Sequence, residues 1–499
     1  MDWILGSSVL VCTVSLWWYS CVWWNKKKKM EMMLMASRVN NNGNKGRIPN
    51  GSLGWPLIGE TLEFIACGCS SNPLKFMHNH STLYGKVFKT HILGRPIIIS
   101  SDSEVNKVVL QNDGRTFIPF YPRSIIELLG KSSILQISGN LHKRVHGLVG
   151  AFLKSSSLKE IITRDLENLL RLSFITWSDG QQIYMQNEAK EITFQALIKV
   201  LLGLGPGEEF KLLEKQFKEF IKGLICLPIK LPGTTLHKSL KAKQRIMKLI
   251  EKIIEEKMIK CSNCDENGEL NDVVDVLLKQ MKDDDDDDQN ITIDFICSNI
   301  TEMMIPGEDS VPMLITLALK FLGDSPSSLN QLKEENMELK MKKRCSGESY
   351  SWKDYMSLSF TQNVISETLR MGNIIMGAWR KALTDVEIKG YLIPKDWCIM
   401  ACFSSIHLDQ DNYEKPFQFD PWRWQKIEGS NQNNFTPFGG GQRLCPGQEL
   451  SRLEAAIFLH HFVTTFSWVA EEDMIITFPT VKMKKRLPII LKTLVTSHV

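Results

Sequence analysis

The sequence lacks the cysteine pattern of a disulfide-stabilised or zinc-binding protein. Its 12 cysteines are scattered over 499 residues, without the dense spacing of a small secreted disulfide framework. Cys261 and Cys264 have C-x-x-C spacing, but no second pair follows at the distance that a zinc site requires. Both lie in the polar stretch CSNCDENGE, which favours a plain loop over a zinc or redox site. The cysteine usage therefore fits reduced thiols in a protein that faces the cytosol.

The sequence also lacks a large excess of charge of either sign. It has 60 Lys and Arg against 56 Asp and Glu, a formal net charge of +4. No long basic face with interleaved aromatic residues is present, so nucleic acid is not an expected partner. Hydrophobic residues make up 43% of the chain, as in a soluble globular body, and no internal repeat divides it.

Residues 3–24 lack any charged side chain, and the stretch is long enough to cross a hydrocarbon core of roughly 30 Å. Aromatic residues gather toward its end and Lys26 to Lys29 follow at once, as at the cytoplasmic flank of an anchor. A cleaved signal peptide is the alternative, but the positive charges follow the apolar stretch and no small-residue cleavage site is present. We expect a transmembrane anchor at 1–25, a basic linker with Pro and Gly at 26–56, and a folded body at 57–499 facing the cytoplasm.

The body combines helical and strand patterns. Residues 84–100 alternate as in a short hairpin, and the acidic run at 283–288 predicts a solvated loop. A long apolar helix is expected after it, from about 291 to 322. Other expected helices lie at about 157–173, 208–223, 238–260, 355–371 and 449–466, and expected strands near 385–402 and 474–492. The pattern predicts a mainly α fold with small β-sheets (α+β), and one body rather than several domains.

The strongest pattern is the stretch FGGGQRLCPG at 438–447. Its glycines permit positive φ and close backbone approach, and Pro446 sets the turn before a helix. Such a loop brings a single cysteine, Cys445, close to a flat partner. A cysteine just before a helix N-terminus has its thiolate favoured by the helix dipole and by loop N–H groups. Arg443 supplies a positive charge suited to a carboxylate.

This stretch, written F-x-x-G-x-R-x-C-x-G, resembles the haem-binding loop of the cytochrome P450 family, and every fixed position matches. The resemblance implies the cytochrome P450 fold with an N-terminal transmembrane helix, and haem b with Cys445 as the axial ligand of its iron. A thiolate ligand favours O–O cleavage. The resemblance also implies that Phe438 packs beside the haem, that Arg443 pairs with a propionate and that Gly447 helps to bind the cofactor. A glycine-rich turn with an incidental buried cysteine is the alternative.

Glu367 and Arg370 form an E-x-x-R pattern, which places opposite charges one helical turn apart. Alone, such a pair is usually a surface pair worth roughly a few tenths of a kcal/mol. The stretch FDPWRW at 419–424 resembles the family segment whose arginine joins this pair. That implies a structural network of Glu367, Arg370 and Arg423 behind the haem. Arg380 stands where the family often has a propionate partner, with a surface arginine as the alternative.

The sequence departs from the family at the helix that contacts the propionates. Where a W-x-x-x-R pattern is common, this chain has HKRVH at 142–146, without the tryptophan or the arginine of that pattern. His142 and His146 are the candidate donors in their place, with Arg144 nearby. The propionate contacts on this side stay open.

An acid and an alcohol stand inside the long apolar helix, in the stretch PGEDSVP at 306–312. Pro306 is expected to kink the helix, and Gly307 opens space beside the kink. Buried polar groups are costly without partners, so Asp309 and Ser310 need an explanation. The distal helix of the family has this shape, with threonine more usual at the position of Ser310. The resemblance implies that Asp309 and Ser310 deliver protons to bound O₂, and a kinked core helix is the alternative.

The resemblance further implies an apolar pocket, which suits a large lipid-like substrate and agrees with a membrane anchor. Each candidate residue, taken alone, is more often part of a core than a ligand contact. The candidates are Phe117, Phe120, Met303, Met304, Ile374, Ile375, Met376 and Phe478.

Two stretches, 306–312 and FTPFGGGQRLCPGQELSRLE at 435–454, resemble plant steroid hydroxylases of brassinosteroid biosynthesis. Within that group the similarity is greatest to enzymes that oxidise the sterol side chain near C-23. Neighbouring enzymes act at C-22, or on cholesterol in steroidal saponin and alkaloid pathways, and the residues do not choose among these. The implied partners are a steroid, a membrane and an NADPH-dependent flavoprotein reductase, with a single-pass location in the endoplasmic reticulum membrane.

Two other classes of function stay open at this point. A non-redox haem enzyme that rearranges a bound peroxide would lack the distal acid and alcohol, and both are present here. A non-catalytic haem or sterol-binding protein would lack the proton relay or the cysteine. Dependence of substrate consumption on reductase and NADPH separates these classes.

Overall fold

A computed structural model describes residues 46–56, 58–261, 271–282, 291–426 and 434–494. The anchor predicted at 1–25, the acidic run at 283–288 and Cys264 lie outside the described residues. Within the described ranges, no helix combines the length and the apolar character needed to cross a membrane. The chain divides into two compact units, one made of the chain up to Ile118 with Gly377–Ile406, the other of Pro119–Met376 with His407–Val499.

The first unit is built on a five-stranded sheet with the strand order β1-β2-β8-β5-β3. Its strands are β1 (Val87–Ile92), β2 (Arg95–Ser100), β8 (Cys398–Cys402), β5 (Gly377–Ala382) and β3 (Phe117–Pro119). The hairpin predicted at 84–100 is confirmed, because β1 and β2 pair antiparallel around Leu93 and Gly94, both with positive φ. β2 pairs parallel with β8, and both strands are largely buried, as a parallel pair covered on both faces should be.

Short helices and a second hairpin complete the first unit. They are α2 (Thr61–Gly68), α3 (Lys75–Tyr84), α4 (Ser103–Gln111), β6 (Val386–Ile388) and β7 (Tyr391–Ile393). The described end of the segment predicted as a linker lies along these strands. The Arg47 N–H donates to the Gly390 carbonyl, and the Lys89 N–H donates to the Asn50 carbonyl, both at 2.9 Å.

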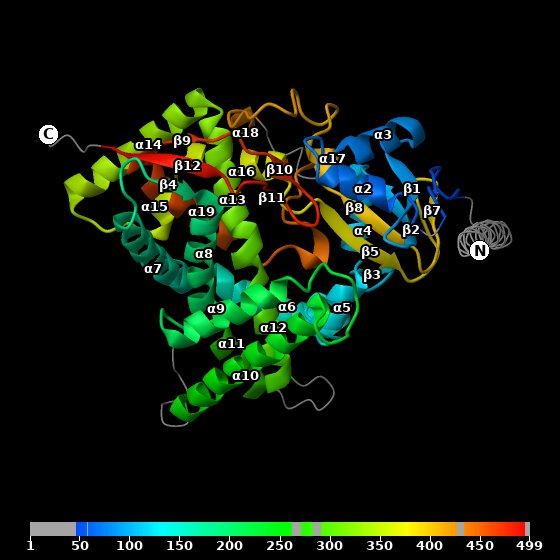
Figure 1. Ribbon diagram of the computed structural model, residues 1–499, viewed down its shortest axis with the longest axis horizontal. Coiled ribbons are helices and arrows are strands. Elements are labelled where there is room, and N and C mark those ends of the chain that lie inside the picture. Colours follow the sequence, from blue (N-terminus) through cyan, green and yellow to red (C-terminus); the bar gives the residue numbers. More distant parts are fainter. Residues whose placement is uncertain (1–45, 57, 262–270, 283–290, 427–433, 495–499) are drawn as a thin grey trace, which may run out of the picture. The chain divides into compact units, whose positions relative to one another are not determined.

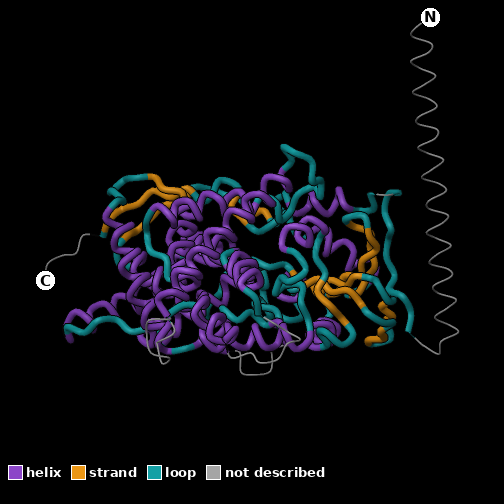
Figure 2. Tube along the Cα trace, turned by 90° about the horizontal axis from the view of Figure 1, so that it is seen from below, coloured by secondary structure: helices purple, strands orange, loops and turns teal. Residues whose placement is uncertain are grey.

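The second unit is mainly helical, and its strands are short (Figure 2). Its helices are α5 (Arg123–Leu129), α6 (Gly139–Lys154), α7 (Ser156–Ile175), α8 (Met185–Leu202), α9 (Glu208–Ile221), α10 (Thr235–Cys261), α11 (Val273–Lys282), α12 (Ile293–Met303), α13 (Ile305–Gly323), α14 (Pro326–Ser346), α15 (Trp352–Met356), α16 (Ser359–Gly372), α17 (Ser404–His407, which begins in the first unit), α18 (Arg423–Lys426) and α19 (Gln448–Val463). Its strands are β4 (Gln182–Tyr184), β9 (Phe466–Ala470), β10 (Ile475–Ile476), β11 (Lys482–Met483) and β12 (Pro488–Thr493). The predicted mainly α composition with small sheets is confirmed.

Helix α13 runs through the core of the second unit, where it packs against α8, α16 and α19 (Figure 1). Leu314, Ile315 and Leu317 of α13 belong to one hydrophobic cluster with Phe458 and Phe462 of α19. A helix that is apolar on nearly all sides needs such surroundings. The core therefore fixes α13 relative to α19, which begins three residues after Cys445.

The long helix predicted from 291 to 322 is in fact two helices. α12 ends at Met303 and α13 begins at Ile305, with Met304 between them in a helical backbone conformation, so the interruption expected at Pro306 is confirmed. Pro306 lies in the first turn of α13, where the N–H that it lacks would have no intrahelical partner. Pro312 is tolerated inside α13.

Candidate functional site

The segment around Cys445 forms a tight loop between α18 and α19. The Cys445 N–H donates to the Phe438 carbonyl at 3.1 Å, and the Gly439 N–H donates to the Thr436 carbonyl at 3.0 Å. Gly439 and Gly441 have φ values of 77° and 66°, which L side chains adopt only with strain. The glycines thus allow the loop to fold back on itself and to present Cys445 just before α19.

The Cys445 thiol is largely desolvated. Burial raises the pKa of Cys445, while the Gly447 N–H lowers it. A bound metal cation would reverse this balance and favour the thiolate. Among the described residues, no group of three or more His, Cys, Asp or Glu side chains is placed to hold a metal. A single cysteine donor therefore fits a metal that brings its own equatorial ligands, as the iron of haem does.

Arg443 is held by a backbone segment between α5 and α6. Its guanidinium donates to the carbonyls of Ile134 and Leu135, both at 3.3 Å, and to the carbonyl of Ile137. These carbonyls orient the predicted propionate partner. The sequence predicted the arginine but not the segment that holds it.

The other side of this segment is bound by α12. The Asn299 Oδ1 accepts the Ile134 N–H at 2.7 Å, and the Glu302 carboxylate accepts the Ser133 hydroxyl at 2.6 Å. Burial raises the pKa of Glu302 to about 7, while the Ser133 hydroxyl and the charge of Lys243 lower it. Asn299 and Glu302 were not predicted, because one polar residue on an apolar helix gives no periodic signal.

Helix α6 contacts the cysteine loop through one of its two candidate histidines. The His146 Nε2 lies 2.8 Å from the Leu444 carbonyl, and since a carbonyl only accepts, Nε2 carries the proton. His142 is buried, and its ring lies 5.3 Å from that of His146. His146 thus donates to the backbone next to Cys445.

The predicted Glu367, Arg370 and Arg423 network is present in the geometry of the second unit. Arg370 donates to Glu367 through Nη2 at 2.7 Å and through Nε at 2.9 Å, and Arg423 Nε donates to Glu367 Oε1 at 2.9 Å. The Trp424 indole and the Asp420 N–H also donate to the Glu367 carboxylate, both at 3.0 Å. Glu367 and Arg370 are wholly buried, so these bonds take the place of bonds to water.

Arg370 also reaches a residue that the sequence did not single out. Its Nη1 donates to the His407 carbonyl at 2.8 Å and to the Pro416 carbonyl at 2.7 Å. The His407 ring accepts the Thr436 N–H at 3.0 Å and contacts Asn373 at 2.8 Å. The network therefore extends to the start of the cysteine loop.

The acid and the alcohol predicted on the distal helix lie in the first two turns of α13. Lys190 of α8 contacts both Glu308 at 3.0 Å and Asp309 at 3.3 Å. Burial raises the pKa of Glu308, while Lys190 lowers it. A Cβ at Gly307 would lie 2.6 Å from the Leu197 side chain, so a larger residue there would displace Leu197 of α8. Ser310 is half-buried.

Arg380 and Phe117 lie in the first unit, away from solvent. Arg380 is buried, with Nε 3.5 Å from Asp113 and Nη1 donating to the Trp379 carbonyl at 3.0 Å. Phe117 is wholly buried in a hydrophobic cluster with Val105. Arg380 is thus not a surface arginine.

The other pocket candidates lie in the second unit and differ in exposure. Met304 is wholly buried in a hydrophobic cluster, and Ile375 is exposed. The half-buried candidates, which retain surface for a ligand, are Phe120, Met303, Ile374, Met376 and Phe478.

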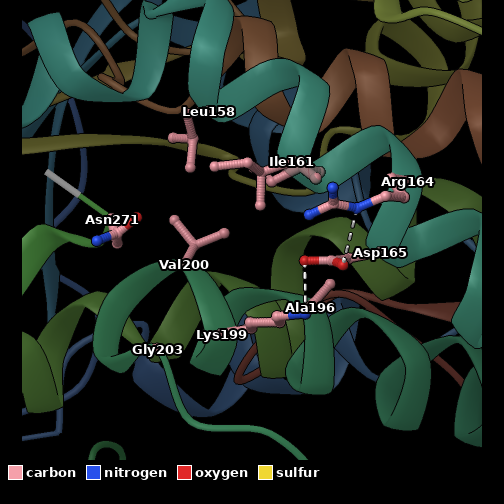
Figure 3. Close-up of a pocket in the computed structure, with 10 residues that line it drawn as sticks. Leu158, Ile161, Arg164, Asp165, Ala196, Lys199, Val200, Gly203 and Asn271 are labelled. Atoms are coloured by element: carbon pink, nitrogen blue, oxygen red, sulfur yellow. Dashed lines mark ion pairs between the residues drawn. The ribbon is translucent and has the colours of Figure 1, made fainter. Parts of the chain in front are cut away.

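A separate pocket of about 230 Å³ lies between α7 and α8. Figure 3 shows Asp165 between Lys199 and Arg164, with Leu158, Ile161 and Val200 nearby. The Asp165 carboxylate lies 2.7 Å from Lys199 and 3.9 Å from Arg164. None of the predicted site residues lines this pocket.

Comparison with known proteins identifies the family to which the chain is similar. Residues 49–492 match the family described as cytochrome P450. Two 3-epi-6-deoxocathasterone 23-monooxygenases of Arabidopsis thaliana are 60% identical over 89% of this chain and 84% of the relative, and 53% identical over 91% of both. A steroid (22S)-hydroxylase of Oryza sativa is 36% identical over 89% of this chain and 87% of its own length.

The fold agrees with a solved structure of low sequence identity. The retinoic acid-bound cyanobacterial CYP120A1 superposes with a TM-score of 0.77 at 23% identity, over 90% of this chain and all of that one. Such a match speaks for the fold alone. With the family match over residues 49–492, it confirms the resemblance carried by the cysteine loop. The chain belongs to the cytochrome P450 family, and it is a monooxygenase that uses haem iron and electrons from NADPH.

Proposed function

We propose that this protein hydroxylates the side chain of a plant steroid at C-23, in brassinosteroid biosynthesis. The observation that carries the proposal is the 60% identity, over 89% of the chain, to a relative named as a 3-epi-6-deoxocathasterone 23-monooxygenase. A second relative of the same name is 53% identical. The 22S-hydroxylase, at 36%, is much less similar, which favours C-23 over C-22.

We propose Cys445 as the axial ligand of the haem iron. The tight loop around it and the desolvated position of its thiol support this role. Arg443 and Arg380 would bind propionates, Phe438 would pack beside the ring, and Gly447 would let α19 begin close to it. His146 supports the loop from behind through the Leu444 carbonyl, with His142 beside it. When bound, the cofactor supplies reductive activation of O₂, which the thiolate promotes.

Asp309 and Ser310 are the proposed proton donors. Lys190 of α8 holds the Asp309 carboxylate at 3.3 Å and the Glu308 carboxylate at 3.0 Å, so the cation fixes both acids beside Ser310. The Ser310 hydroxyl both accepts and donates hydrogen bonds, so it would take a proton from Asp309 at its oxygen and pass one on. Glu308 is a further carboxyl in the same cluster, and burial raises its pKa.

The pocket is proposed to be lined by apolar side chains from several segments of the second unit. Met303 comes from the end of α12, Ile374 and Met376 from the chain after α16, and Phe478 from the C-terminal turn. A steroid is rigid and largely apolar, so such a lining binds it without stranding polar groups.

We further propose the domain division and location expected from the sequence. Residues 1–25 anchor the protein in the endoplasmic reticulum membrane, residues 26–56 link the anchor to the body, and residues 57–499 form the monooxygenase domain on the cytoplasmic side. A membrane-bound flavoprotein reductase supplies the electrons. The full chain should sediment with microsomes, and a variant without residues 1–25 should be released from them by high salt.

The substrate proposal is tested in microsomes that contain the full chain and a plant NADPH-dependent reductase. With 3-epi-6-deoxocathasterone, the product should carry a new hydroxyl at C-23, located by nuclear magnetic resonance. Formation should require both NADPH and the reductase and should be absent with Cys445→Ala. A hydroxyl placed at C-22 instead would assign the activity to the neighbouring group of steroid hydroxylases. Binding of the steroid without any turnover would contradict the enzymatic role.

A further inference from the structure

His407 lies at the end of α17 and is wholly buried. Its carbonyl accepts the guanidinium of Arg370 at 2.8 Å, so its backbone is fixed by the network around Glu367. Its ring faces two other groups, Asn373 on one side and Thr436 on the other. A buried imidazole with partners at both nitrogens is constrained in both orientation and protonation.

The partners of His407 determine its tautomer. The Asn373 Nδ2 donates to the Arg370 carbonyl at 2.9 Å, which leaves Asn373 Oδ1 facing the His407 Nδ1 at 2.8 Å. Because this oxygen only accepts, Nδ1 carries the proton. Nε2 is then unprotonated and accepts the Thr436 N–H. The Asn373 amide oxygen can only accept and the Thr436 N–H can only donate, so the ring proton has no other position.

The charge state of His407 is fixed as well. Burial, together with the adjacent Arg370 cation, lowers the pKa of His407 to about 3. The ring is therefore neutral at any working pH. A protonated ring could not accept the Thr436 N–H, which would then be a buried donor without an acceptor.

Three hydrogen bonds, two of them between backbone groups, lead from His407 to the cysteine. The Thr436 N–H donates to the ring, the Gly439 N–H donates to the Thr436 carbonyl at 3.0 Å, and the Cys445 N–H donates to the Phe438 carbonyl at 3.1 Å. The Phe435 ring, just before Thr436, also packs against His407, with ring centroids 5.7 Å apart.

We infer that His407 is a positioning residue that couples the Glu367–Arg370 pair to the loop carrying Cys445. Its neutral, Nδ1-protonated ring holds the start of that loop through the Thr436 N–H and so sets where the thiolate stands. The inference rests on the proposed role of Cys445. According to this inference, the Glu367–Arg370 network acts on the axial ligand through one acceptor atom, the His407 Nε2.

Two amide variants separate the two ring nitrogens. The longer side chain of His407→Gln can place its oxygen near the position of Nε2 and keep the bond from Thr436. The shorter one of His407→Asn reaches only the position of Nδ1, so it keeps the contact with Asn373 and strands the Thr436 N–H. Both remove the aromatic ring and keep an uncharged amide, and they differ in length by one methylene.

The measurement is the fraction of haem bound through thiolate in the purified, full-length holoprotein, read from the Soret band of the reduced carbon monoxide complex. In His407→Asn, the ratio of thiolate-ligated to other haem should fall about tenfold, the equivalent of about 1.4 kcal/mol for a stranded buried donor. His407→Gln should stay near wild type. Equal ratios in the two variants would overturn the inference.

A third variant, at Asn373, keeps the test decisive if neither histidine variant folds. Asn373 has a left-handed backbone conformation, with φ of 44°, which glycine adopts without strain. Asn373→Gly therefore removes the acceptor that fixes the tautomer and leaves the imidazole in place. The thiolate-ligated fraction should fall, and an unchanged fraction would overturn the inference. Wild type that lacks the thiolate band would instead refute the role of Cys445.

Discussion

Arg370 and Glu367 form a two-point ion pair with both side chains wholly buried. The Nη2–Oε1 distance is 2.7 Å and the Nε–Oε2 distance is 2.9 Å. The remaining guanidinium nitrogen donates to two backbone carbonyls, so each donor direction of the fork is used. A pair this well bonded fixes the chain around it, because any displacement would expose an uncompensated buried charge.

The fork geometry predicts that lysine cannot replace Arg370. In Arg370→Lys, one ammonium cannot reach Glu367 and both carbonyls, so polar groups are left unpaired. We expect a loss of about 3–5 kcal/mol in the free energy of unfolding, together with loss of bound haem. Urea unfolding and the haem content per chain measure both. Arg344→Lys, at an exposed arginine, is the matched control and should change neither.

The two adjacent carboxyls of α13 should differ in their effect on catalysis. Asp309→Asn should reduce steroid hydroxylation by roughly 10²-fold, since a positioned acid contributes about that factor. NADPH consumption should fall much less, because electrons are still delivered and only the protons fail to follow. Glu308→Gln contacts the same lysine and is the control, with a smaller effect. Equal losses of product in the two variants would contradict the assignment of Asp309.

Lys190 should determine how far the pH can fall before product formation is lost. Burial already raises the pKa of Glu308, and Lys190 opposes this rise more than the second cation nearby, Lys218. Without the cation, the neighbouring carboxylates are harder to ionise, so Lys190→Met should move the lower pH limb of product formation upward by about one unit. Lys199→Met, which removes the partner of Asp165, should leave the limb unmoved. The measurement is the rate of product formation, with NADPH consumption followed in parallel, at pH values from about 5 to about 9.

His460 should make the protein sensitive to acid. Burial lowers the pKa of His460 to about 2, whereas the pKa of the same histidine in the unfolded chain is about 6.5. Its contribution to stability is therefore complete above about pH 6.5 and is lost as the pH falls below that value, because only the unfolded state binds the proton. His460→Asn, which keeps a donor for the Asn336 Oδ1 found 3.0 Å from Nδ1, should lose this dependence.

The difference in unfolding free energy between His460→Asn and wild type reports this proton alone. It should change by about 1.4 kcal/mol per pH unit between pH 6.5 and 5, in favour of the variant as the pH falls. A difference that stays constant over this range would mean that His460 is protonated in the native protein.

Local patterns in the sequence were enough to predict the cysteine loop, the E-x-x-R pair and the hairpin at 84–100. Each is short, and its residue types are dictated by backbone geometry or by charge at fixed spacing. The interruption near Pro306 was predicted as well, because a proline removes one hydrogen bond from a helical run.

The partners that orient the site could not be predicted. Lys190 and Glu308 are 118 residues apart, and Ser133 and Glu302 are 169 apart. Each is one polar residue in a segment whose periodicity is set by other positions, so only the folded chain reveals the pair. His407 is a similar case, because its importance comes from Asn373 and Thr436, which lie on distant segments.

The central claim is that Cys445 binds haem iron through its thiolate. The most direct test is the difference spectrum of the reduced protein with carbon monoxide, for wild type and Cys445→Ala. A strongly red-shifted Soret band in wild type, absent from the variant, is the expected result. A band typical of histidine-ligated haem, or folded wild-type protein that binds no haem, would contradict the account.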